Sequence, residues 1–378
     1  MKFNAIIVGA GVAGSVMANR LANEGKTVLL LDKRHHIAGN CFDEYDENHL
    51  LIHRYGPHIF HTDNEEVWSY LSQFTEWIPY QHKVLGFIDG QLVPVPFNLN
   101  SIEQLFPKEF AAQLISDLIK EFGFGQKISI LKLLETQNQT FKFLADYVYE
   151  KIFYHYTKKQ WGKDPKELDP TIFHRVPVFI SRDDRYFQDK YQGLPKLGYT
   201  RLFEKMVDHP NIHLMLNTDA KQIIHMNNET KKIFAFGEEF TGQVIYTGTL
   251  DDLFNYELGG LPYRTLKFEL ETHSTASYQD AAVVNYPNNY AFTRITEYKK
   301  LTQQSHLHTV IAKEYPFEYE KANSDHIPYY PVFSKENQAL YETYLNMAKQ
   351  FSNLTVLGRL AEYKYYDIDD MVARVLIY

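Results

Sequence analysis

The stretch GAGVAG at residues 9–14 constrains the fold of this chain more than any other. It follows an apolar run at 3–8, FNAIIV, which predicts a buried strand, and it opens an amphipathic segment, which predicts a helix. Gly9 permits a tight turn, Gly11 lets the backbone approach a pyrophosphate, and Gly14 lets the helix pack on the strand. The N-terminus of such a helix carries roughly half a positive charge. The pattern therefore predicts a dinucleotide-binding βα unit.

An acidic residue follows the second predicted strand, TVLLL at 27–31. The carboxylate of Asp32 can accept hydrogen bonds from a ribose diol, whereas it would repel the 2′-phosphate that Lys33 and Arg34 could otherwise attract. A tight βα turn without a ligand is disfavoured, because strand, helix and acid occur together. NAD and FAD both remain open from these residues.

Composition narrows the class of partner. The chain has 378 residues, which predicts two or three domains, and a net charge of -8, which argues against nucleic acid as the main partner. No apolar run approaches the roughly 20 residues needed to span a bilayer. The only cysteine, Cys41, excludes an internal disulfide framework. We therefore expect a cytoplasmic protein without membrane insertion.

Periodicity changes along the chain. Apolar residues recur at helical spacing between 101 and about 157, and SIEQ predicts a capping box from Ser101 to Gln104. Strand-like pieces broken by turns follow after about residue 173 and would suit an antiparallel sheet. Near the end, LTVLGRL at 354–360 predicts another buried strand. Interleaved domains are expected, since no low-complexity linker separates these regions.

The run RYGPHIFHT at 54–62 places His58 and His61 in an otherwise apolar context. A metal site is disfavoured because no third ligand occurs at a familiar spacing, so no metal is expected. A network of hydrogen-bonded histidines and a role beside a planar cofactor both remain open.

Arginines and tyrosines supply candidates for an anion site. Guanidinium groups grip phosphate oxygens in pairs, and six arginines lie in aromatic or turn-rich contexts: Arg175, Arg182, Arg185, Arg264, Arg294 and Arg359. The alternative to phosphate binding is that each arginine is exposed at the surface. Asp183 or Asp184 could also simply pair with Arg182 or Arg185. The 28 Tyr and 26 Phe could stack on planar rings or only fill the core. The chain has no G-x-S-x-G, complete P-loop or H-E-x-x-H pattern, which excludes these hydrolase and phosphate-loop classes.

Taken in order, a series of motifs resembles the bacterial UDP-galactopyranose mutases nearly from end to end. The motifs are VGAGVAGSVMAN, IAGNCFDE, HRYGPHIFHT, PVPFN, YTKKQWG, RDDRYFQDKYQGLPKLGYT, IYTGTLDDLF, LPYRTLKFE, FTRITEYKK, EYP, PYYPV and GRLAEYKYYDIDDMVARVL. Each alone is weak, but their common order is specific.

The resemblance implies a reversible isomerase that converts UDP-galactopyranose to UDP-galactofuranose, the sugar donor for cell-surface glycans. FAD would be the cofactor and would act in its reduced form, its central-ring nitrogen attacking the anomeric carbon and expelling UDP. The covalently held sugar would then open, reclose as the five-membered ring and recover UDP. A homodimer is also implied.

The resemblance further implies an α/β fold with three parts. A discontinuous Rossmann-like FAD-binding domain would comprise 1–80, about 190–260 and 335–378. A helical domain on the substrate and lid side would comprise 100–165. An antiparallel β-sheet domain would comprise 80–99, 166–190 and 261–334, and the segment from about 173 to 187 would act as a lid.

Catalytic and substrate-binding roles follow by likeness. Arg175 and Arg294 would clamp the diphosphate, and His61 would lie against the flavin face. The hydroxyls of Tyr186, Tyr329 or Tyr330, and Tyr365 would help this clamp, and Phe153, Tyr156, Thr157 and Trp161 would hold uridine. Further substrate contacts are expected from Arg264, Asp367 and His82. Retention of His61, which some relatives acting on other sugars replace with arginine, favours galactose.

Cofactor contacts are carried over in the same way. They are expected from Gly9, Gly11, Val12, Ala13, Gly14, Asp32, Lys33, Gly39, Asn40, His58, Ile59, His61, Arg359, Asp367, Asp369 and Met371. Departures from the family pattern are few: Ala38, Thr249 and His82 replace residues common in relatives, and Arg182 could substitute for a second arginine that is missing near Phe179. A flavin amine oxidase or desaturase, and a catalytically silent nucleotide-sugar binding protein, are the competing functions.

Overall fold

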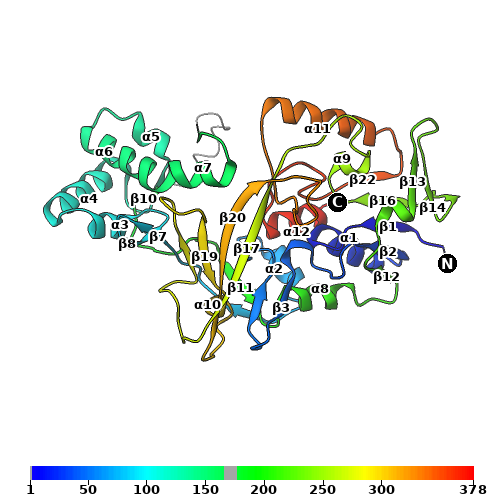
Figure 1. Ribbon diagram of the computed structural model, residues 1–378, viewed down its shortest axis with the longest axis horizontal. Helices are drawn as coiled ribbons and strands as arrows, with labels where there is room; N and C mark the ends of the chain where they lie inside the picture. Colours follow the sequence, from blue (N-terminus) through cyan, green and yellow to red (C-terminus); the bar gives the residue numbers. More distant parts are fainter. Residues whose placement is uncertain (1, 166–176) are drawn as a thin grey trace.

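The structure is a computed structural model that describes residues 2–165 and 177–378. Arg175 and the first part of the expected lid lie outside the described residues. Figure 1 shows a helix-covered sheet near both termini, a helical cluster at the opposite end, and the long strands β17 and β20 between them.

A five-stranded parallel sheet forms the part near the termini. Its order is β12-β2-β1-β16-β22, from Ile212–Met215, Val28–Leu31, Ala5–Val8, Gln243–Tyr246 and Leu354–Val356. The central strand β1 and its neighbour β2 are entirely apolar, as expected for strands of a parallel sheet that helices cover. The helices α1 (Val12–Asn23), α8 (Tyr199–Val207) and α12 (Ile368–Leu376) share one apolar core with β1 and β2. The expected Rossmann-like α/β fold is confirmed.

A seven-stranded sheet forms the middle of the molecule. Its order is β21-β17-β20-β19-β18-β7-β8, from Tyr330–Pro331, Tyr263–His273, Thr309–Glu318, Arg294–Glu297, Val283–Asn285, Val84–Ile88 and Gln91–Val95. Neighbouring strands are antiparallel except β18 and β7, which are parallel, so the sheet is mixed. The chain can run β7 and β18 parallel because almost 200 residues separate them, as a parallel pair requires a long crossover.

The helical cluster lies beyond β8. It contains α3 (Leu99–Leu105), α4 (Lys108–Phe122), α5 (Ile130–Leu134), α6 (Gln139–Val148), a π-helical segment (Tyr149–Tyr154) and α7 (His155–Trp161). Helix α6 buries Phe141, Leu144 and Val148 at the predicted helical spacing. The domain boundaries themselves remain predictions.

The structure describes further strands and helices. They are the strands β3 (Asp43–Tyr45), β4 (Leu51–His53), β5 (Phe60–Thr62), β6 (Trp77–Pro79), β9 (Lys127–Ile128), β10 (Val178–Phe179), β11 (Tyr191–Pro195), β13 (Ile224–Asn227), β14 (Lys232–Ala235) and β15 (Glu238–Glu239), and the helices α2 (Glu65–Leu71), α9 (Leu250–Leu253), α10 (Tyr298–Thr302) and α11 (Lys335–Ala348). Of the helices in the described ranges, none combines the length and apolar composition that a membrane crossing requires.

The start of α3 corrects one expectation from the sequence. The capping box predicted from Ser101 to Gln104 is wrong, because the helix begins three residues earlier with Asn98 as its N-cap. The Asn98 side chain accepts hydrogen bonds from the amides of Asn100 and Ser101 at 2.9 and 3.2 Å, and the Ser101 hydroxyl accepts from the Asn98 amide. The buried Asn98 also donates its side-chain amide to Asp184 at 2.9 Å. One side chain therefore caps α3 and anchors the segment that follows β10.

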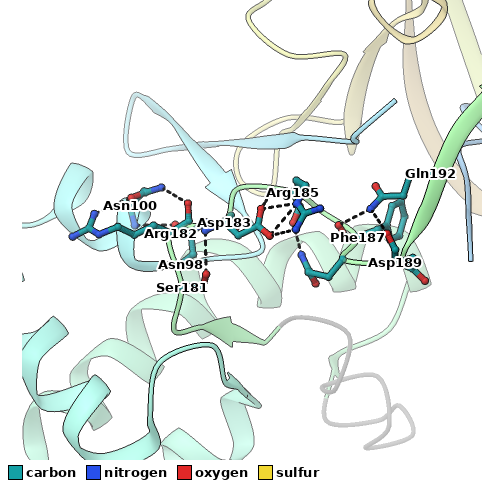
Figure 2. Close-up of polar contacts among 10 residues, drawn as sticks. Asn98, Asn100, Ser181, Arg182, Asp183, Arg185, Phe187, Asp189 and Gln192 are labelled. Carbon is teal, nitrogen blue, oxygen red and sulfur yellow. Dashed lines mark hydrogen bonds and ion pairs between the residues drawn. The ribbon is translucent and has the colours of Figure 1, made fainter. Parts of the chain in front are cut away.

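Ion pairs and hydrogen bonds continue this anchor along residues 181–192 (Figure 2). Arg182 donates to Asn100 and forms an exposed two-point pair with Glu103, while Arg185 pairs with Asp183 at 2.6 Å. The sequence left open whether an aspartate pairs with one of these arginines, and Arg185 does so. Arg182 is committed to the surface of α3 and does not line the cavity described below, so the suggested substitution for a missing site arginine has no support in this arrangement.

We expect Asn98→Ala to lower the free energy of unfolding by about 2–3 kcal/mol, because it removes a cap and leaves buried amides without an acceptor. Asn138→Ala is the matched control: Asn138 caps α6 through amides of its own first turn only. Its loss should cost about 1 kcal/mol. Urea unfolding of both variants measures the difference, and equal losses would contradict the anchoring role of Asn98.

Candidate functional site

A cavity of about 1270 Å³ lies where the two sheets and the helical cluster meet. Pockets for one small ligand usually enclose about 300–1,000 Å³. This cavity therefore has room for a dinucleotide and a second ligand together. Its lining includes the glycine-rich turn after β1, the 57–61 loop, whose last two residues begin β5, and also α7 and the start of α12.

The glycine-rich turn and Gly39 leave a space that side chains would fill. We call Gly9, Gly11, Gly14 and Gly39 the glycine cradle. Gly9 has a φ of +101°, and a Cβ atom on it would lie 2.1 Å from the hydroxyl oxygen of Thr247. A Cβ on Gly14 would lie 1.8 Å from the carbonyl oxygen of Gly9, so α1 can pack on β1 only without one. Gly11 faces Gly39 across the turn, and both line the cavity with Val12, Ala13 and Asn40. The cradle fits a pyrophosphate at a helix N-terminus.

Asp32 is held rigidly at the end of β2. One carboxylate oxygen accepts from the amide of Ala10 and the other from the amide of Arg34, both at 2.8 Å. Asp32 and Lys33 line the cavity. Each carboxylate oxygen has a further lone pair, so the side chain can also accept from a ribose diol as the sequence predicts.

The 57–61 loop brings His58, Ile59 and His61 to the cavity. The Nδ1 of His58 lies 2.9 Å from the carbonyl oxygen of Gly56, which assigns the ring proton to Nδ1 and leaves Nε2 as an acceptor. The ring of His61 stacks on Phe187 with centroids 3.6 Å apart, and its Nδ1 lies 3.3 Å from Asp189. Among the described residues, no group of three or more His, Cys, Asp or Glu side chains is arranged to hold a metal ion. His58 thus belongs to a hydrogen-bonded network and to the cavity wall at once.

Burial strongly lowers the pKa values of three histidines in this region. It lowers the pKa of His53 to about 4, and together with neighbouring positive charges it lowers the pKa values of His58 and His82 to about 3. All three are therefore neutral at physiological pH.

These shifts predict an acid-sensitive fold. The unfolded chain takes up protons on histidine below about pH 6.5, whereas the folded chain does not until about pH 3–4, so stability present above pH 6.5 is lost as pH falls through that window. We expect His82→Asn to flatten the fall of Tm between pH 6.5 and 4, because it removes one of the three groups. The same substitution at the exposed His225 serves as the control for the exchange of histidine by asparagine. A slope in His82→Asn equal to that of the wild type would rule out the contribution of His82.

Arg294 is a cation of the cavity that a buried carboxylate holds in place. It starts β19 opposite Glu314 on β20, and its Nε and Nη2 contact one Glu314 oxygen at 2.7 and 2.6 Å. Glu314 is 1% exposed and also accepts from the Thr293 hydroxyl. Burial alone would lower the pKa of Arg294, but the charge and the hydrogen bond of Glu314, together with Tyr156 and Tyr330, outweigh it and raise the pKa. A rigid, permanently charged guanidinium therefore faces the cavity, with Nη1 making no hydrogen bond to the described residues.

The C-terminal part adds aromatic rings and a helix N-terminus. Tyr330 and Tyr365 stack with centroids 6.0 Å apart, and the guanidinium of Arg359 lies over both rings at 5.6 and 6.0 Å. The Tyr365 hydroxyl donates to Asp367, the N-cap of α12. Asp369 and Met371, in the first turn of α12, also line the cavity.

The π-helical segment and α7 supply the opposite wall. Phe153, Tyr156, Thr157 and Trp161 all line the cavity, as the resemblance implies for a uridine site. A π-helical turn widens a helix locally and is frequent at functional sites. His82 and Tyr186 complete this side, and the Tyr186 amide donates to the His82 carbonyl at 2.7 Å.

Three predicted site residues are placed elsewhere. Arg264 and Tyr329 are buried but do not line the cavity, and Gly14 acts through helix packing. The Arg264 Nε donates to the carbonyl oxygen of Gln160 at 2.8 Å, so it supports the end of α7 instead.

Gln160, Phe187 and Asn285 line the cavity although sequence reasoning did not single them out. Gln160 and Phe187 stand inside quoted motifs, YTKKQWG and RDDRYFQDK, which was the available signal.

Comparison with known proteins agrees with this geometry. Residues 151–365 match the UDP-galactopyranose mutase family, and residues 7–74 match the NAD(P)-binding Rossmann-like domain. The chain is 40% identical to "Probable UDP-galactopyranose mutase" of Klebsiella pneumoniae, over 99% of this chain and 93% of the relative. It is 37% identical to "dTDP-fucopyranose mutase" of Escherichia coli, over 96% and 94%.

A solved structure supports the fold. The crystal structure of a reduced UDP-galactopyranose mutase superimposes with a TM-score of 0.73 at 16% identity, covering 100% of this chain and 93% of that one. A putrescine oxidase shares the fold more distantly, with a TM-score of 0.58, 11% identity and full coverage of both chains. The fold alone is therefore common to mutases and oxidases, whereas sequence identity along the whole chain is with the mutases. The chain belongs to the UDP-galactopyranose mutase family.

Proposed function

We propose that this chain interconverts UDP-galactopyranose and UDP-galactofuranose, with FAD in its reduced form as cofactor. The observation that carries the proposal is the juxtaposition, in one cavity, of a dinucleotide cradle and the fixed guanidinium of Arg294. Family membership makes the chain a nucleotide-sugar mutase; the sugar, the nucleotide and the cofactor are the proposed part.

The residues present fit FAD. The glycine cradle leaves space where side chains would block a pyrophosphate, and Asp32 retains free lone pairs for a ribose diol. The residues expected to hold the cofactor are those of the cradle, the 57–61 loop and the first turn of α12. When bound and reduced, FAD supplies an electron-rich nucleophile for the anomeric carbon.

The role of the protein is to bind, orient and stabilise charge. Arg294 would hold the diphosphate through the edge of its guanidinium that Glu314 does not occupy. Negative charge grows on the diphosphate as the anomeric bond breaks, so this contact strengthens towards the transition state. Tyr156 and Tyr330 stay protonated because burial raises the pKa of each, and their hydroxyls can donate to phosphate oxygens. Arg175, expected as the second clamp, lies outside the described residues.

Neutral histidines keep the sugar side free of competing charge. The pKa values of His58 and His82 lie near 3, so neither offers a second cation to the diphosphate at neutral pH. We propose galactose rather than a 6-deoxysugar for two reasons. His61 is retained, and the similar proteins from Klebsiella pneumoniae and Mycoplasma pneumoniae are named as UDP-galactopyranose mutases. The dTDP-fucopyranose mutase relative makes the sugar the point to test.

The test is direct. Dithionite-reduced protein is incubated with UDP-galactofuranose or with dTDP-fucofuranose, and the pyranose is detected by chromatography. The proposal expects conversion of the galactose substrate with the higher kcat/KM. Preferential conversion of the fucose substrate would overturn the sugar assignment, and a colourless protein that binds UDP without taking up flavin would favour a silent binding protein. The cytoplasmic location and the homodimer remain predictions.

A further inference from the structure

We propose that Lys159 is a positioning residue for nucleotide-sugar binding, because its ammonium group joins helix α7 to the loop that leads into Arg294. The inference rests on the proposed function and deepens it, since it concerns how the two sides of the substrate site are held at the right separation.

The contacts of Lys159 are unusually complete. Its Nζ lies 2.5, 3.1 and 3.1 Å from the carbonyl oxygens of Tyr286, Tyr290 and Phe292. A lysine ammonium group has three hydrogen-bond donors, and here each one has an acceptor. All three acceptors belong to the loop 286–293 between β18 and β19, which a hydrogen bond from the Tyr286 amide to the Thr293 carbonyl closes. The loop therefore wraps the ammonium group.

The charge of Lys159 is directed at this loop alone. Within the described residues no carboxylate lies within ion-pair distance of its Nζ, in contrast to Lys151, which pairs with Asp89. Burial lowers the pKa of Lys159 to about 8, so the ammonium form with its three donors still prevails at neutral pH. A partly buried charge without a counter-ion is costly to keep unless backbone dipoles meet it, as they do here.

The two ends of this link carry the two sides of the substrate site. On α7, Lys159 stands between Tyr156 and Gln160, which both line the cavity. On the loop, Phe292 is followed directly by Thr293 and Arg294, whose side chains both bind Glu314. Tyr156 and Arg294 line the same cavity, and α7 packs against β20, the strand that pairs with β19 and Arg294. Lys159 thus sets the position of α7 relative to the diphosphate arginine.

Neighbouring contacts support the same link. The Asn288 side-chain amide, also on the 286–293 loop, donates to the Lys151 carbonyl at 2.8 Å in the π-helical segment. Aromatic rings of Tyr286, Tyr290 and Phe292 pack on one another with centroids 4.8–5.3 Å apart and stiffen the loop around the ammonium group. Rigid support of this kind lets a binding site keep its geometry before the ligand arrives.

The experiment uses the flavin-loaded full chain and compares Lys159→Met with Lys158→Met. Lys158 is the matched control because it is exposed on the same helix, with its Nζ 5.9 Å from the Tyr154 ring. UDP affinity is measured by titration calorimetry on the oxidised protein, and KM and kcat for UDP-galactofuranose are measured after reduction. Flavin absorbance and thermal melts report on folding.

We expect Lys159→Met to raise the dissociation constant of UDP and the KM by about tenfold, with kcat reduced by less than about threefold and flavin content unchanged. Lys159→Arg, which keeps the charge, should recover part of the affinity, and Lys158→Met should bind like the wild type. Asn288→Ala should also raise the dissociation constant of UDP, because it removes another contact between the 286–293 loop and the π-helical segment. If Lys159→Met does not fold, this variant tests the proposal instead.

Two results with a folded Lys159→Met protein would overturn the proposal: UDP affinity within twofold of the control, or a partial loss of flavin and thermal stability that accounts for the weaker binding. If that variant does not fold, an unchanged UDP affinity in Asn288→Ala overturns it. The proposed function fails separately, when the wild type binds UDP but converts no sugar. A wild type that does not bind UDP at all would remove both.

Discussion

Replacing Arg294 with alanine is expected to lower kcat/KM for the nucleotide sugar by about 100-fold or more. The charge-assisted contact of a fixed guanidinium with a diphosphate is worth several kcal/mol when charge grows on the phosphate oxygens, and each 1.4 kcal/mol is about tenfold in rate. The protein should remain yellow, because the expected cofactor contacts lie in the cradle, the 57–61 loop and α12. Steady-state kinetics after reduction, with flavin content determined by absorbance, measure the effect.

Loss of Arg294 would also leave Glu314 without its ion-pair partner. Glu314 is 1% exposed, and without its partner it would retain a buried negative charge that destabilises the protein and repels the diphosphate. The double variant Arg294→Ala with Glu314→Gln removes this charge, so a rate loss that persists in it belongs to the clamp. Arg182→Ala is the control, because Arg182 pairs with Glu103 on the exposed surface of α3 and should keep its rate within threefold. Near-normal rates in the double variant would refute the clamp assignment.

Alanine substitutions in the glycine cradle should have the second large effect, and the defect should differ between Gly14 and Gly11. A Cβ on Gly14 would lie 1.8 Å from a backbone oxygen, so Gly14→Ala should displace α1 from β1 and destabilise the fold by at least about 3 kcal/mol. A Cβ on Gly11 would meet protein only at 3.6 Å, an ordinary contact, but would enter the space for a pyrophosphate. Gly11→Ala should therefore fold normally and take up little FAD.

Denaturant unfolding of the flavin-free proteins, followed by flavin titration, separates these effects. The expected result is a stable Gly11→Ala protein with flavin affinity reduced by about 100-fold, and a Gly14→Ala protein that is unstable even without flavin. A Gly11→Ala protein that binds FAD as the wild type does would show that the cradle does not hold the pyrophosphate.

Local patterns in the sequence predicted the first βα unit and much of the cavity wall. The turn 9–14 and Asp32 are short-range features, and their geometry follows from the special backbone freedom of glycine and the position of the strand ends. The roles of the residues on α7 and α12 depended on the ordered resemblance, since spacing alone could not distinguish a site tyrosine such as Tyr330 from the core tyrosine Tyr329.

Long-range pairing explains what sequence reasoning missed. Arg294 and Glu314 meet because β19 and β20 pair in a register that no local pattern specifies. Lys159 finds three carbonyls on a loop more than 120 residues away, and backbone acceptors leave no signature in side-chain identity. The cap of α3 was misplaced for a related reason: Asn98 is both a cap and a long-range partner of Asp184, whereas the apparent cap at Ser101 is its reciprocal partner in the first turn.

The number of sugar molecules converted for each equivalent of reductant consumed tests the central claim most directly. The fold is shared with a putrescine oxidase, and an oxidase or desaturase consumes an oxidant or reductant with every turnover. A ring-size isomerase leaves the oxidation state of its substrate unchanged, so under anaerobic conditions one reduction should support many conversions of UDP-galactofuranose to UDP-galactopyranose. A ratio that stays at one conversion per reducing equivalent, however long the incubation lasts, would contradict the account.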